Sequence, residues 1–174
     1  KVLLLGTGGV SIYALQIAKA MGAYVAITSS SDEKLEKAKA LGADFIVNYK
    51  AEPEWGSAVN AWSGEKGVDH VVEVGGPATL AQSINACRVN GNIVLIGVLT
   101  GVKGDVPTAA LMAKQINLKG IIVGSREHQN DFVNALEASG IKPVIDTSFS
   151  LDELAKAFEY EVNGKHFGKI CIDI

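Results

Sequence analysis

The stretch that decides the fold is the first eleven residues, Lys1-Val-Leu-Leu-Leu-Gly-Thr-Gly-Gly-Val-Ser11. Residues 2–5 form a short apolar run, which is typical of a strand buried on both faces of a sheet. The run ends at Gly6, and Gly6, Gly8 and Ser11 then follow the spacing G-x-G-x-x-small. A helical pattern begins directly afterwards. The stretch therefore predicts a strand, a tight turn and a helix that together bind the diphosphate of a dinucleotide.

Each small residue of this turn has a physical task. Gly6 permits the tight turn, Gly8 lets a diphosphate approach the backbone because it has no Cβ, and Ser11 lets the helix pack on the strand. The helix is predicted to begin at Gly9 and to end before Gly22. Apolar residues at helical spacing predict its buried face: Val10, Ala14, Ile17, Ala18 and Met21. The alternative is a glycine-rich turn without a ligand, but the agreement of strand, glycines and helix favours phosphate binding.

Further along the chain, β-type runs alternate with helical stretches, and such alternation produces a parallel sheet with helices on both faces. The sequence therefore predicts an α/β fold with a doubly wound, six-stranded parallel sheet of the Rossmann type, whose ligand lies at the carboxyl ends of the strands. The predicted strands are residues 2–5, 24–28, 45–49, 68–74, 92–98 and 118–123. After the second of these, Ser30 and Glu33 predict a capping box that opens the next helix.

The last fifty residues have a different pattern. They predict a helix over residues 130–138, a short strand over 140–145, a helix from Ser150 to about Val162 and a final strand over 168–174. A strand, helix and strand that follow a complete sheet suggest part of another domain. We therefore expect a dinucleotide-binding domain over residues 1–125 and a C-terminal segment over 126–174 that returns to a second domain.

Composition excludes several classes of protein. The 174 residues carry 16 basic and 19 acidic side chains, a net charge of −3, which gives no reason to expect a nucleic-acid partner. No apolar run approaches the length of a membrane span, and without a signal peptide the expected location is the cytoplasm. Cys87 and Cys171 lie far apart and are expected to be buried thiols, and no Cys/His motif with metal-ligand spacing occurs. Because Lys1 directly precedes a core strand, we expect the chain to be part of a longer polypeptide.

The end of the second predicted strand indicates which dinucleotide is bound. NAD sites usually place Asp or Glu about 20 residues beyond the glycines, where it binds the ribose hydroxyls. Here that region holds Thr28, Ser29 and Ser30 instead, followed by Lys34. Hydroxyls and an ammonium bind a 2′-phosphate that a carboxylate would repel, so NADP is favoured, with NAD as the alternative. A competing interpretation is that Ser30 only caps the helix and Lys34 is solvated surface.

Four stretches resemble the medium-chain dehydrogenase/reductases, and most closely their zinc-type alcohol dehydrogenase and quinone oxidoreductase branches. They are Val-Leu-Leu-Leu-Gly-Thr-Gly-Gly-Val at residues 2–10, Leu-Gly-Ala-Asp-Phe-Ile-Val-Asn-Tyr at 41–49, Asn-Ile-Val-Leu-Ile-Gly-Val at 92–98 and His-Phe-Gly-Lys-Ile at 166–170. The resemblance covers essentially the whole chain. It implies that these residues form the C-terminal, cofactor-binding part of such an enzyme.

The resemblance also implies roles for individual residues. Gly6, Gly8, Gly9 and Val10 would line the diphosphate, Lys34 and Tyr49 would flank the 2′-phosphate, Val74 would touch the nucleoside, Gly97 and Val98 would meet the nicotinamide, and Lys169 would lie near the cofactor phosphates. Each residue has a simpler alternative. The glycines can be turn formers, Tyr49 an aromatic at the rim, Val74 and Val98 core residues, and Lys169 a solvated lysine.

Family members carry their substrate pocket, and zinc ligands where present, in a β-rich domain that precedes the nucleotide-binding domain. This sequence holds no such region, so it identifies no catalytic residue and no metal ligand; any zinc is expected in the absent half. His70, His128 and His166 have no Cys or acidic partner at ligand spacing and are expected to be structural. We also expect a homodimer, because in relatives the edge formed by the sixth strand joins two subunits.

The predicted function is cofactor binding within an NADP-dependent oxidoreductase that passes hydride between NADPH and an alcohol, aldehyde or quinone as its small-molecule substrate, the fragment alone being inactive. The alternative is a non-catalytic module that binds or senses a dinucleotide. A methyltransferase also uses a glycine-rich turn after its first strand, but it usually carries an acidic residue at the end of the second, where this chain has Thr28 and Ser29.

Overall fold

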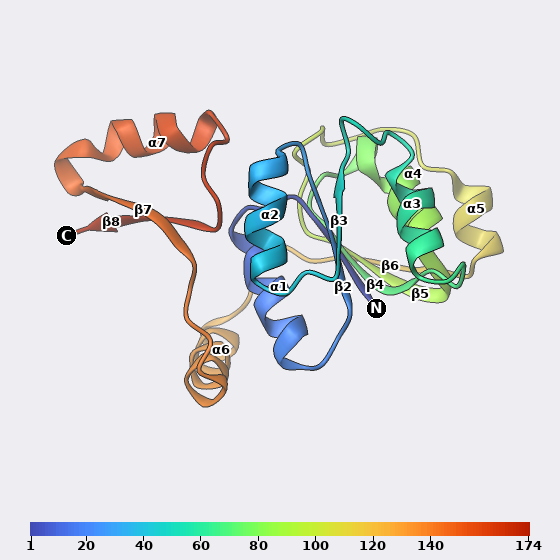
Figure 1. The fold of residues 1–174 in the computed structure, drawn as a ribbon, viewed down its shortest axis with the longest axis horizontal. Helices are drawn as coiled ribbons and strands as arrows, with labels where there is room; N and C mark the ends of the chain where they lie inside the picture. The colour runs from blue at the N-terminus through green and yellow to red at the C-terminus, as the bar shows by residue number, and fades with distance from the viewer.

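The computed structural model describes all residues from 1 to 174 and confirms an α/β fold with a six-stranded parallel sheet (Figure 1). The strand order is β3-β2-β1-β4-β5-β6, and a separate parallel pair is formed by β7 and β8. The strands are β1 Val2–Leu5, β2 Val25–Ser29, β3 Phe45–Asn48, β4 Val68–Glu73, β5 Cys87–Leu95, β6 Asn117–Gly120, β7 Ile145–Ser150 and β8 Lys169–Asp173. The helices are α1 Gly9–Ala20, α2 Asp32–Ala40, α3 Trp55–Trp62, α4 Pro77–Ala86, α5 Thr108–Ala113, α6 Arg126–Ser139 and α7 Leu154–Val162, with a short 3₁₀ turn at Leu151–Glu153.

Strand β1 lies in the middle of the sheet, between β2 and β4, and its side chains alternate between the two faces. Leu3 contributes to a core that contains buried residues of α3 and α4, while Leu4 contributes to a core with residues of α1 and α2. Both leucines are fully buried. Figure 1 shows the two helix pairs on opposite sides of the sheet, which is the doubly wound arrangement. From the centre of the sheet the chain adds strands in opposite directions, first β2 and β3 beside β1 and then β4, β5 and β6 on its other side. The glycine turn after β1 therefore lies where the crevice between the two halves of the sheet opens.

The predicted buried face of α1 is only partly right. Ala14 and Ala18 pack against the core as predicted, but the fully buried side chains are Ser11, Ile12 and Leu15, and Val10 is 46% and Met21 81% exposed. The helix is apolar on more than one side, so its periodicity alone does not identify the side that meets the sheet. The second apolar side faces α6, where Tyr13 packs edge-on against the ring of Phe132 with 5.5 Å between centroids.

Two helix starts differ from the predictions. Helix α2 is capped by Ser31 and not by Ser30, because Ser31 has the extended backbone of an N-cap and its Oγ accepts from the N–H of Lys34. Helix α6 begins at Arg126, four residues before the predicted start, because Ser125 and His128 form a capping box.

Three predicted strand positions are also corrected. Strand β5 occupies Cys87–Leu95 in place of the predicted 92–98, and within it Asn90 adopts a positive φ of 56°. Strand β6 ends at Gly120, so residues 121–123 lie beyond it. Strand β7 occupies Ile145–Ser150 in place of the predicted 140–145. Its position follows from parallel pairing with β8 across the sequence, which local patterns do not contain.

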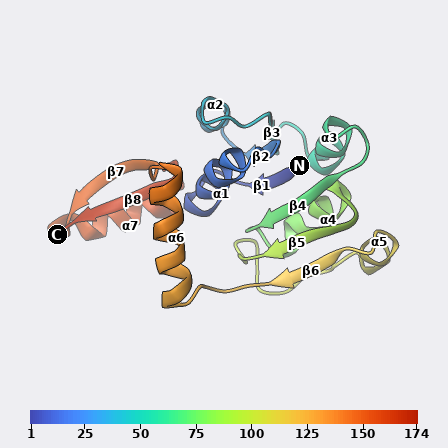
Figure 2. The same ribbon diagram turned by 90° about the horizontal axis from the view of Figure 1, so that it is seen from below.

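The C-terminal segment docks on the glycine turn. The β7–β8 pair and α7 lie beside the main sheet, next to α1 (Figure 2). The N–H of Gly168 donates to the carbonyl of Thr7 at 3.0 Å, and Gly8 pairs with Gly168 in an isolated parallel bridge. Phe167 is buried in the core that contains Leu4. No helix in the structure has both the length and the apolar character needed to cross a bilayer.

Candidate functional site

The turn after β1 is built from a left-handed glycine and a satisfied serine. Gly6 has φ of 74°, and its N–H donates to Thr28 Oγ1 at 3.2 Å. Ser11 is 1% exposed, and its hydroxyl donates to the carbonyl of Leu5 at 2.6 Å. A serine is therefore tolerated where glycine or alanine is usual, because the hydroxyl of its buried side chain has a hydrogen-bond partner. The bond ties the first turn of α1 to the end of β1.

The N-terminus of α1 presents backbone without side-chain bulk. Gly8 is the N-cap, has extended backbone and makes no side-chain capping bond. Gly9 is the first helical residue, and Val10 follows on the exposed side. The first N–H groups of a helix have no partner within the helix, and its dipole is positive at this end. These residues can therefore bind an anion through backbone amides.

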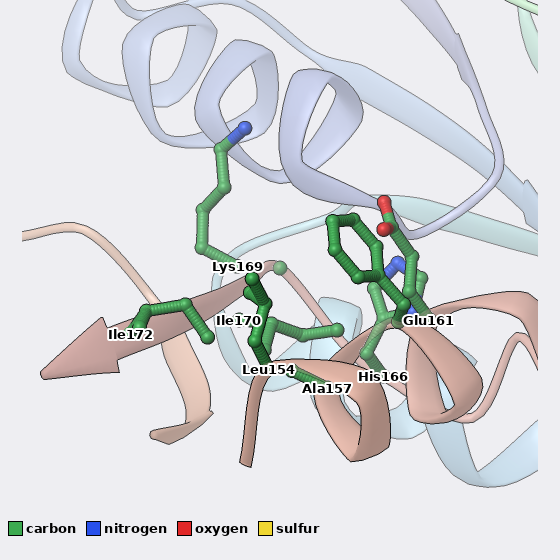
Figure 3. Close-up of a pocket in the computed structure, with 9 residues that line it drawn as sticks. Leu154, Ala157, Glu161, His166, Lys169, Ile170 and Ile172 are labelled. Atoms are coloured by element: carbon green, nitrogen blue, oxygen red, sulfur yellow. The ribbon is translucent and has the colours of Figure 1, made fainter. Parts of the chain in front are cut away.

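Lys169 brings a positive charge to the same place. A Cβ built on Gly9 would lie 2.6 Å from Cε and 2.7 Å from Nζ of Lys169, so the lysine side chain occupies the space that glycine leaves. Figure 3 shows this side chain extending from the start of β8 toward α1. The turn and the C-terminal strand thus form one cationic surface.

A cavity of about 260 Å³ lies below Lys169, between α7 and β8 (Figure 3). His166 lines it, and the imidazole Nε2 lies 3.9 Å from the Cβ position built on Gly8. The Nδ1 atom of His166 is buried without a hydrogen-bond partner. Of the three histidines, this is the one that lies against the turn.

A second cavity, of about 340 Å³, opens at the carboxyl ends of the central strands. It brings together three of the residues that the sequence predicts as cofactor contacts, Gly6, Tyr49 and Val74. The complete lining is Leu5, Gly6, Thr28, Tyr49, Trp55, Val74, Gly75, Ala78, Thr79, Leu99 and Thr100. A mostly apolar cleft with a few polar groups at this edge is typical of a ligand site in a doubly wound sheet.

The two serines at the end of β2 have different environments. Ser29 is 4% exposed, and its Oγ accepts from the N–H of Ser31 at 3.3 Å and lies 3.5 Å from Thr7 Oγ1. Its hydroxyl is therefore turned into the protein. Ser30 is half-buried and follows directly on the strand. Ser30 is thus the more accessible of the two hydroxyls.

Lys34 lies in the first turn of α2, and its ammonium donates to the carbonyl of Gly164 at the end of α7. Burial lowers the pKa of Lys34 from its ordinary value, and the charge of Asp146 opposes that shift. Asp32, the acidic residue nearest the strand end, accepts a hydrogen bond from Asn48 Nδ2 at 2.7 Å. No carboxylate occupies the end of β2 itself.

Gly97 and Val98 follow β5 and do not themselves line the cavity, although the next two residues, Leu99 and Thr100, do. A Cβ on Gly97 would lie 2.2 Å from the carbonyl oxygen of Val74, so only glycine fits there. Val98 is 53% exposed, and its Cα lies 3.2 Å from the Cβ position built on Gly76. The ends of β4 and β5 are therefore in close contact.

Sequence reasoning missed several residues of the cleft. Trp55 forms part of its wall, Thr79 and Thr100 supply hydroxyls, and Glu73 is a fully buried carboxylate just behind it. A signal existed for Glu73, which is an acidic residue at the end of an apolar strand and directly before Val74-Gly75-Gly76. The others carry no local signal because tertiary packing alone brings them to the cleft.

The cysteines and histidines do not gather. No group of three or more His, Cys, Asp or Glu side chains is placed to hold a metal ion. Cys87 is buried as expected, and burial raises the pKa of its thiol to about 11, while Cys171 is only half-buried. His70 lies in β4, and His128 caps α6.

The fold and the glycine turn together define a dinucleotide-binding domain of the Rossmann type. The family pattern described as zinc-binding dehydrogenase matches residues 9–158. The chain therefore belongs to the zinc-binding dehydrogenases, a family of medium-chain oxidoreductases that includes alcohol dehydrogenases. The resemblance noted in the sequence is thereby confirmed.

Individual relatives agree with this assignment. The chain is 46% identical over 178 residues to a zinc-type alcohol dehydrogenase-like protein of Schizosaccharomyces pombe, a match that covers 99% of this chain and 51% of that protein. It is 30% identical to an alcohol dehydrogenase of Geobacillus stearothermophilus, covering 99% of this chain and 50% of that one. The chain spans about half the length of the curated relatives it matches.

Solved structures show the same fold. The crystal structure of an NAD-dependent alcohol dehydrogenase superposes with a TM-score of 0.90 at 32% identity, covering 99% of this chain and 51% of that one. A quinone oxidoreductase of Pseudomonas syringae pv. tomato superposes with a TM-score of 0.84 at 27% identity, covering 99% and 57%.

Proposed function

We propose that residues 1–125 bind a nicotinamide dinucleotide as the cofactor domain of an alcohol dehydrogenase-like oxidoreductase, and that residues 126–174 lead into a second domain. The observation that carries the proposal is the side-chain-free N-terminus of α1, where Gly8 leaves room for a diphosphate and Gly9 leaves room for the side chain of Lys169 beside it. A side chain at Gly8 would fill space that the phosphates need, and one at Gly9 would displace the lysine. The cavity at the ends of the strands offers the adjoining space for a nucleoside.

In this proposal each part of the chain has a physical task. The backbone amides of Gly9 and Val10 and the ammonium of Lys169 bind the diphosphate, while Gly6 holds the turn that aims them. Val74 contacts the nucleoside, and Gly97 and Val98 orient the nicotinamide through their backbone groups. The nicotinamide supplies hydride chemistry when it is bound, and the protein supplies its orientation. The 174 residues offer no acid, base or metal site to which a step can be assigned.

We propose NADP as the preferred cofactor, with NAD as the alternative. Ser30 follows directly on β2 and Lys34 lies in the first turn of α2, no carboxylate at the end of β2 would repel a 2′-phosphate, and Tyr49 lines the neighbouring cavity. The buried hydroxyl of Ser29 contributes by holding the turn of the chain at Ser31. Lys34 would exchange its bond to the Gly164 carbonyl for a charge-assisted bond to the phosphate.

Titration with NADPH and NADH tests the cofactor choice. Wild-type protein is expected to bind NADPH more tightly, and Lys34→Ala is expected to remove most of that preference because the ammonium is lost. Lys39→Ala, an exposed lysine of the same helix, is the matched control and should leave the preference unchanged. Equal affinity of the wild type for both dinucleotides would show that the 2′-phosphate is not recognised.

The proposed substrate is an alcohol, aldehyde or quinone, as the names of the relatives suggest. The chain holds no cluster that fits zinc, so any zinc would be bound by a part that these residues do not include. Turnover by a protein that contains both this chain and the remaining half of its relatives' length would support the enzyme. Dinucleotide binding by such a protein without any turnover would favour a sensing module.

We also propose a homodimer formed through the edge of the sheet at β6. Strand β6 is the last strand in the sheet order, and an open edge invites pairing with a second strand. The three residues that follow it, Ile121, Ile122 and Val123, are 43%, 88% and 86% exposed. A run of exposed apolar residues at an open edge supports a subunit contact there.

A further inference from the structure

Glu73, at the end of β4, is a carboxylate with no contact to solvent and no ion-pair partner. Its side chain is 0% exposed, and none of the salt bridges of the structure includes it. Burial of an unpaired charge is costly unless hydrogen bonds compensate for the lost water. Such a residue therefore needs a specific set of donors, and the positions of those donors indicate what it does.

The two carboxylate oxygens of Glu73 have different partners. Oε1 accepts from the N–H of Gly75 at 2.8 Å, from the N–H of Gly76 at 3.0 Å and from the hydroxyl of Thr79 at 2.6 Å. Oε2 accepts from the hydroxyl of Ser83, in the next turn of α4. One oxygen thus fixes the loop between β4 and α4, while the other anchors the carboxylate to the helix.

The loop held by Oε1 is a wall of the cofactor cleft. Gly75 and Thr79 line the cavity, and Gly76 has φ of 94°, a conformation that glycine adopts readily and other residues rarely do. Without a fixed acceptor, two adjacent glycines would leave this segment free to take other conformations. The Glu73 carboxylate therefore fixes the conformation of the Gly75-Gly76 segment, which has no side chains of its own to do so.

The same residue also holds the end of β5. The backbone carbonyl of Glu73 accepts from the N–H of Ile96 at 2.8 Å and of Gly97 at 3.3 Å. Beyond β5, the hydroxyl and the N–H of Thr100 both donate to the carbonyl of Gly75 at 2.8 Å, and the hydroxyl accepts from the N–H of Ala78. The loop that carries Gly97 and Val98 is therefore fastened to the loop that Glu73 fixes.

We propose that Glu73 is a positioning residue for the dinucleotide: its Oε1 holds the β4–α4 loop, and through Thr100 the β5–α5 loop, in the shape that the cofactor requires. The inference rests on the proposed function, since it assigns a role within that same cleft. This positioning role can be distinguished from a role in stability alone, because Oε1 contacts the loop at the cleft whereas Oε2 contacts only the helix. Loss of the Oε1 contacts should weaken binding, whereas loss of the Oε2 contact should only destabilise the fold.

The test compares dissociation constants for NADPH, followed through energy transfer from Trp55, which lies in the cleft, at a temperature well below the melting point of every variant. Glu73→Asp withdraws the acceptor by one methylene and is expected to weaken binding by about tenfold. Glu73→Gln keeps an acceptor toward the glycines and turns its amide toward Ser83, so binding within about twofold of wild type is expected. Ser83→Ala, the matched control, should lower the melting temperature and leave the dissociation constant unchanged.

A second pair keeps the test valid if Glu73→Asp does not fold. Thr79→Val removes the hydroxyl that donates to Oε1 and is expected to weaken binding, whereas Thr79→Ser retains that hydroxyl and should bind as the wild type does. The inference is overturned if Glu73→Asp binds like the wild type, if Ser83→Ala loses as much affinity as Glu73→Asp, or if Glu73→Gln loses as much. A wild type that binds no dinucleotide would instead refute the proposed function, and this inference with it.

Discussion

At the scale of the residue, the function proposed here depends on what a few side chains do to the space around the α1 N-terminus. Gly9 has no side chain, and the stem of Lys169 fills that space and carries its ammonium to the helix end. The lysine is far from the turn in sequence, yet the bond between Gly168 and Thr7 fixes its position. A charge placed this way attracts phosphate in addition to the helix dipole.

Replacement of Lys169 by methionine is therefore expected to weaken NADPH binding by about tenfold, because a charge-assisted contact to the diphosphate is lost. The loss should shrink as salt is added, since screening already reduces the wild-type contribution. Isothermal titration at two salt concentrations measures both effects. Lys165→Met, an exposed lysine four residues earlier, should bind as the wild type does. Equal affinity of Lys169→Met and wild type would place this lysine outside the site.

The two cysteines give a prediction that depends on pH. Burial raises the pKa of Cys87 to about 11, so near neutral pH its thiol is protonated and also shielded from reagents. Native protein is expected to be alkylated at the half-buried Cys171 first, with Cys87 reacting only as the pH approaches that raised pKa or after unfolding. Mass spectrometry of tryptic peptides distinguishes the two sites. Preferential labelling of Cys87 at neutral pH would contradict the buried position.

At the scale of the element, the start of α2 holds two adjacent serines with different expected roles, one in stability and the other in cofactor binding. Ser31 caps the helix, while Ser30, one residue earlier, makes no hydrogen bond through its side chain. The sequence predicted Ser30 as the cap because it has Glu33 three residues later. The structure begins the helix one residue further on, since the backbone of Ser31 is extended and that of Asp32 is helical. Only Ser30 has the capping-box spacing in sequence, but any serine can be an N-cap, so the backbone geometry decides which of the two caps the helix.

Ser31→Ala is therefore expected to reduce the free energy of unfolding by about 1 kcal/mol, because a helix N–H loses its cap. Ser30→Ala should leave stability unchanged and weaken binding of NADPH but not of NADH. Chemical denaturation and dinucleotide titration of both variants provide the comparison. If Ser30→Ala destabilises the protein as much as Ser31→Ala does, the assignment of the cap is wrong.

At the scale of the whole molecule, the β6 edge determines whether the chain associates. Substitution of Ile122 by aspartate puts a charge into the exposed apolar run after β6 and is expected to convert a dimer into a monomer without loss of folding. Size-exclusion chromatography with light scattering measures the mass. Val162→Asp, which alters an equally exposed valine in α7, is the matched control and should leave the dimer intact. A wild type that remains monomeric at micromolar concentration would refute the proposed dimer.

The whole molecule also shows how far the sequence predicts this fold. The turn at Gly6 to Ser11 and the succession of six strands along the chain are local patterns, so they could be predicted. The end of β6, the position of β7 and the buried side of α1 depend on pairing and packing between distant segments; the first two predictions were wrong, and the third was right only for Ala14 and Ala18. The same distinction between local patterns and packing applies to the residues that line the cleft. Gly6 was predicted from its motif and Val74 from the family resemblance, whereas Trp55 reaches the cleft only because α3 packs on the sheet.

The most direct test of the central claim is the dissociation constant of NADPH for wild-type protein and for Gly8→Ala. The fold has room for this methyl group, because the atom nearest to a Cβ at Gly8 is His166 Nε2 at 3.9 Å, and the backbone there is extended. The methyl group should nevertheless keep a diphosphate away from the amides. We therefore predict an unchanged melting temperature and affinity lower by at least about tenfold. Equal affinity in the two proteins would show that the diphosphate does not lie at this turn.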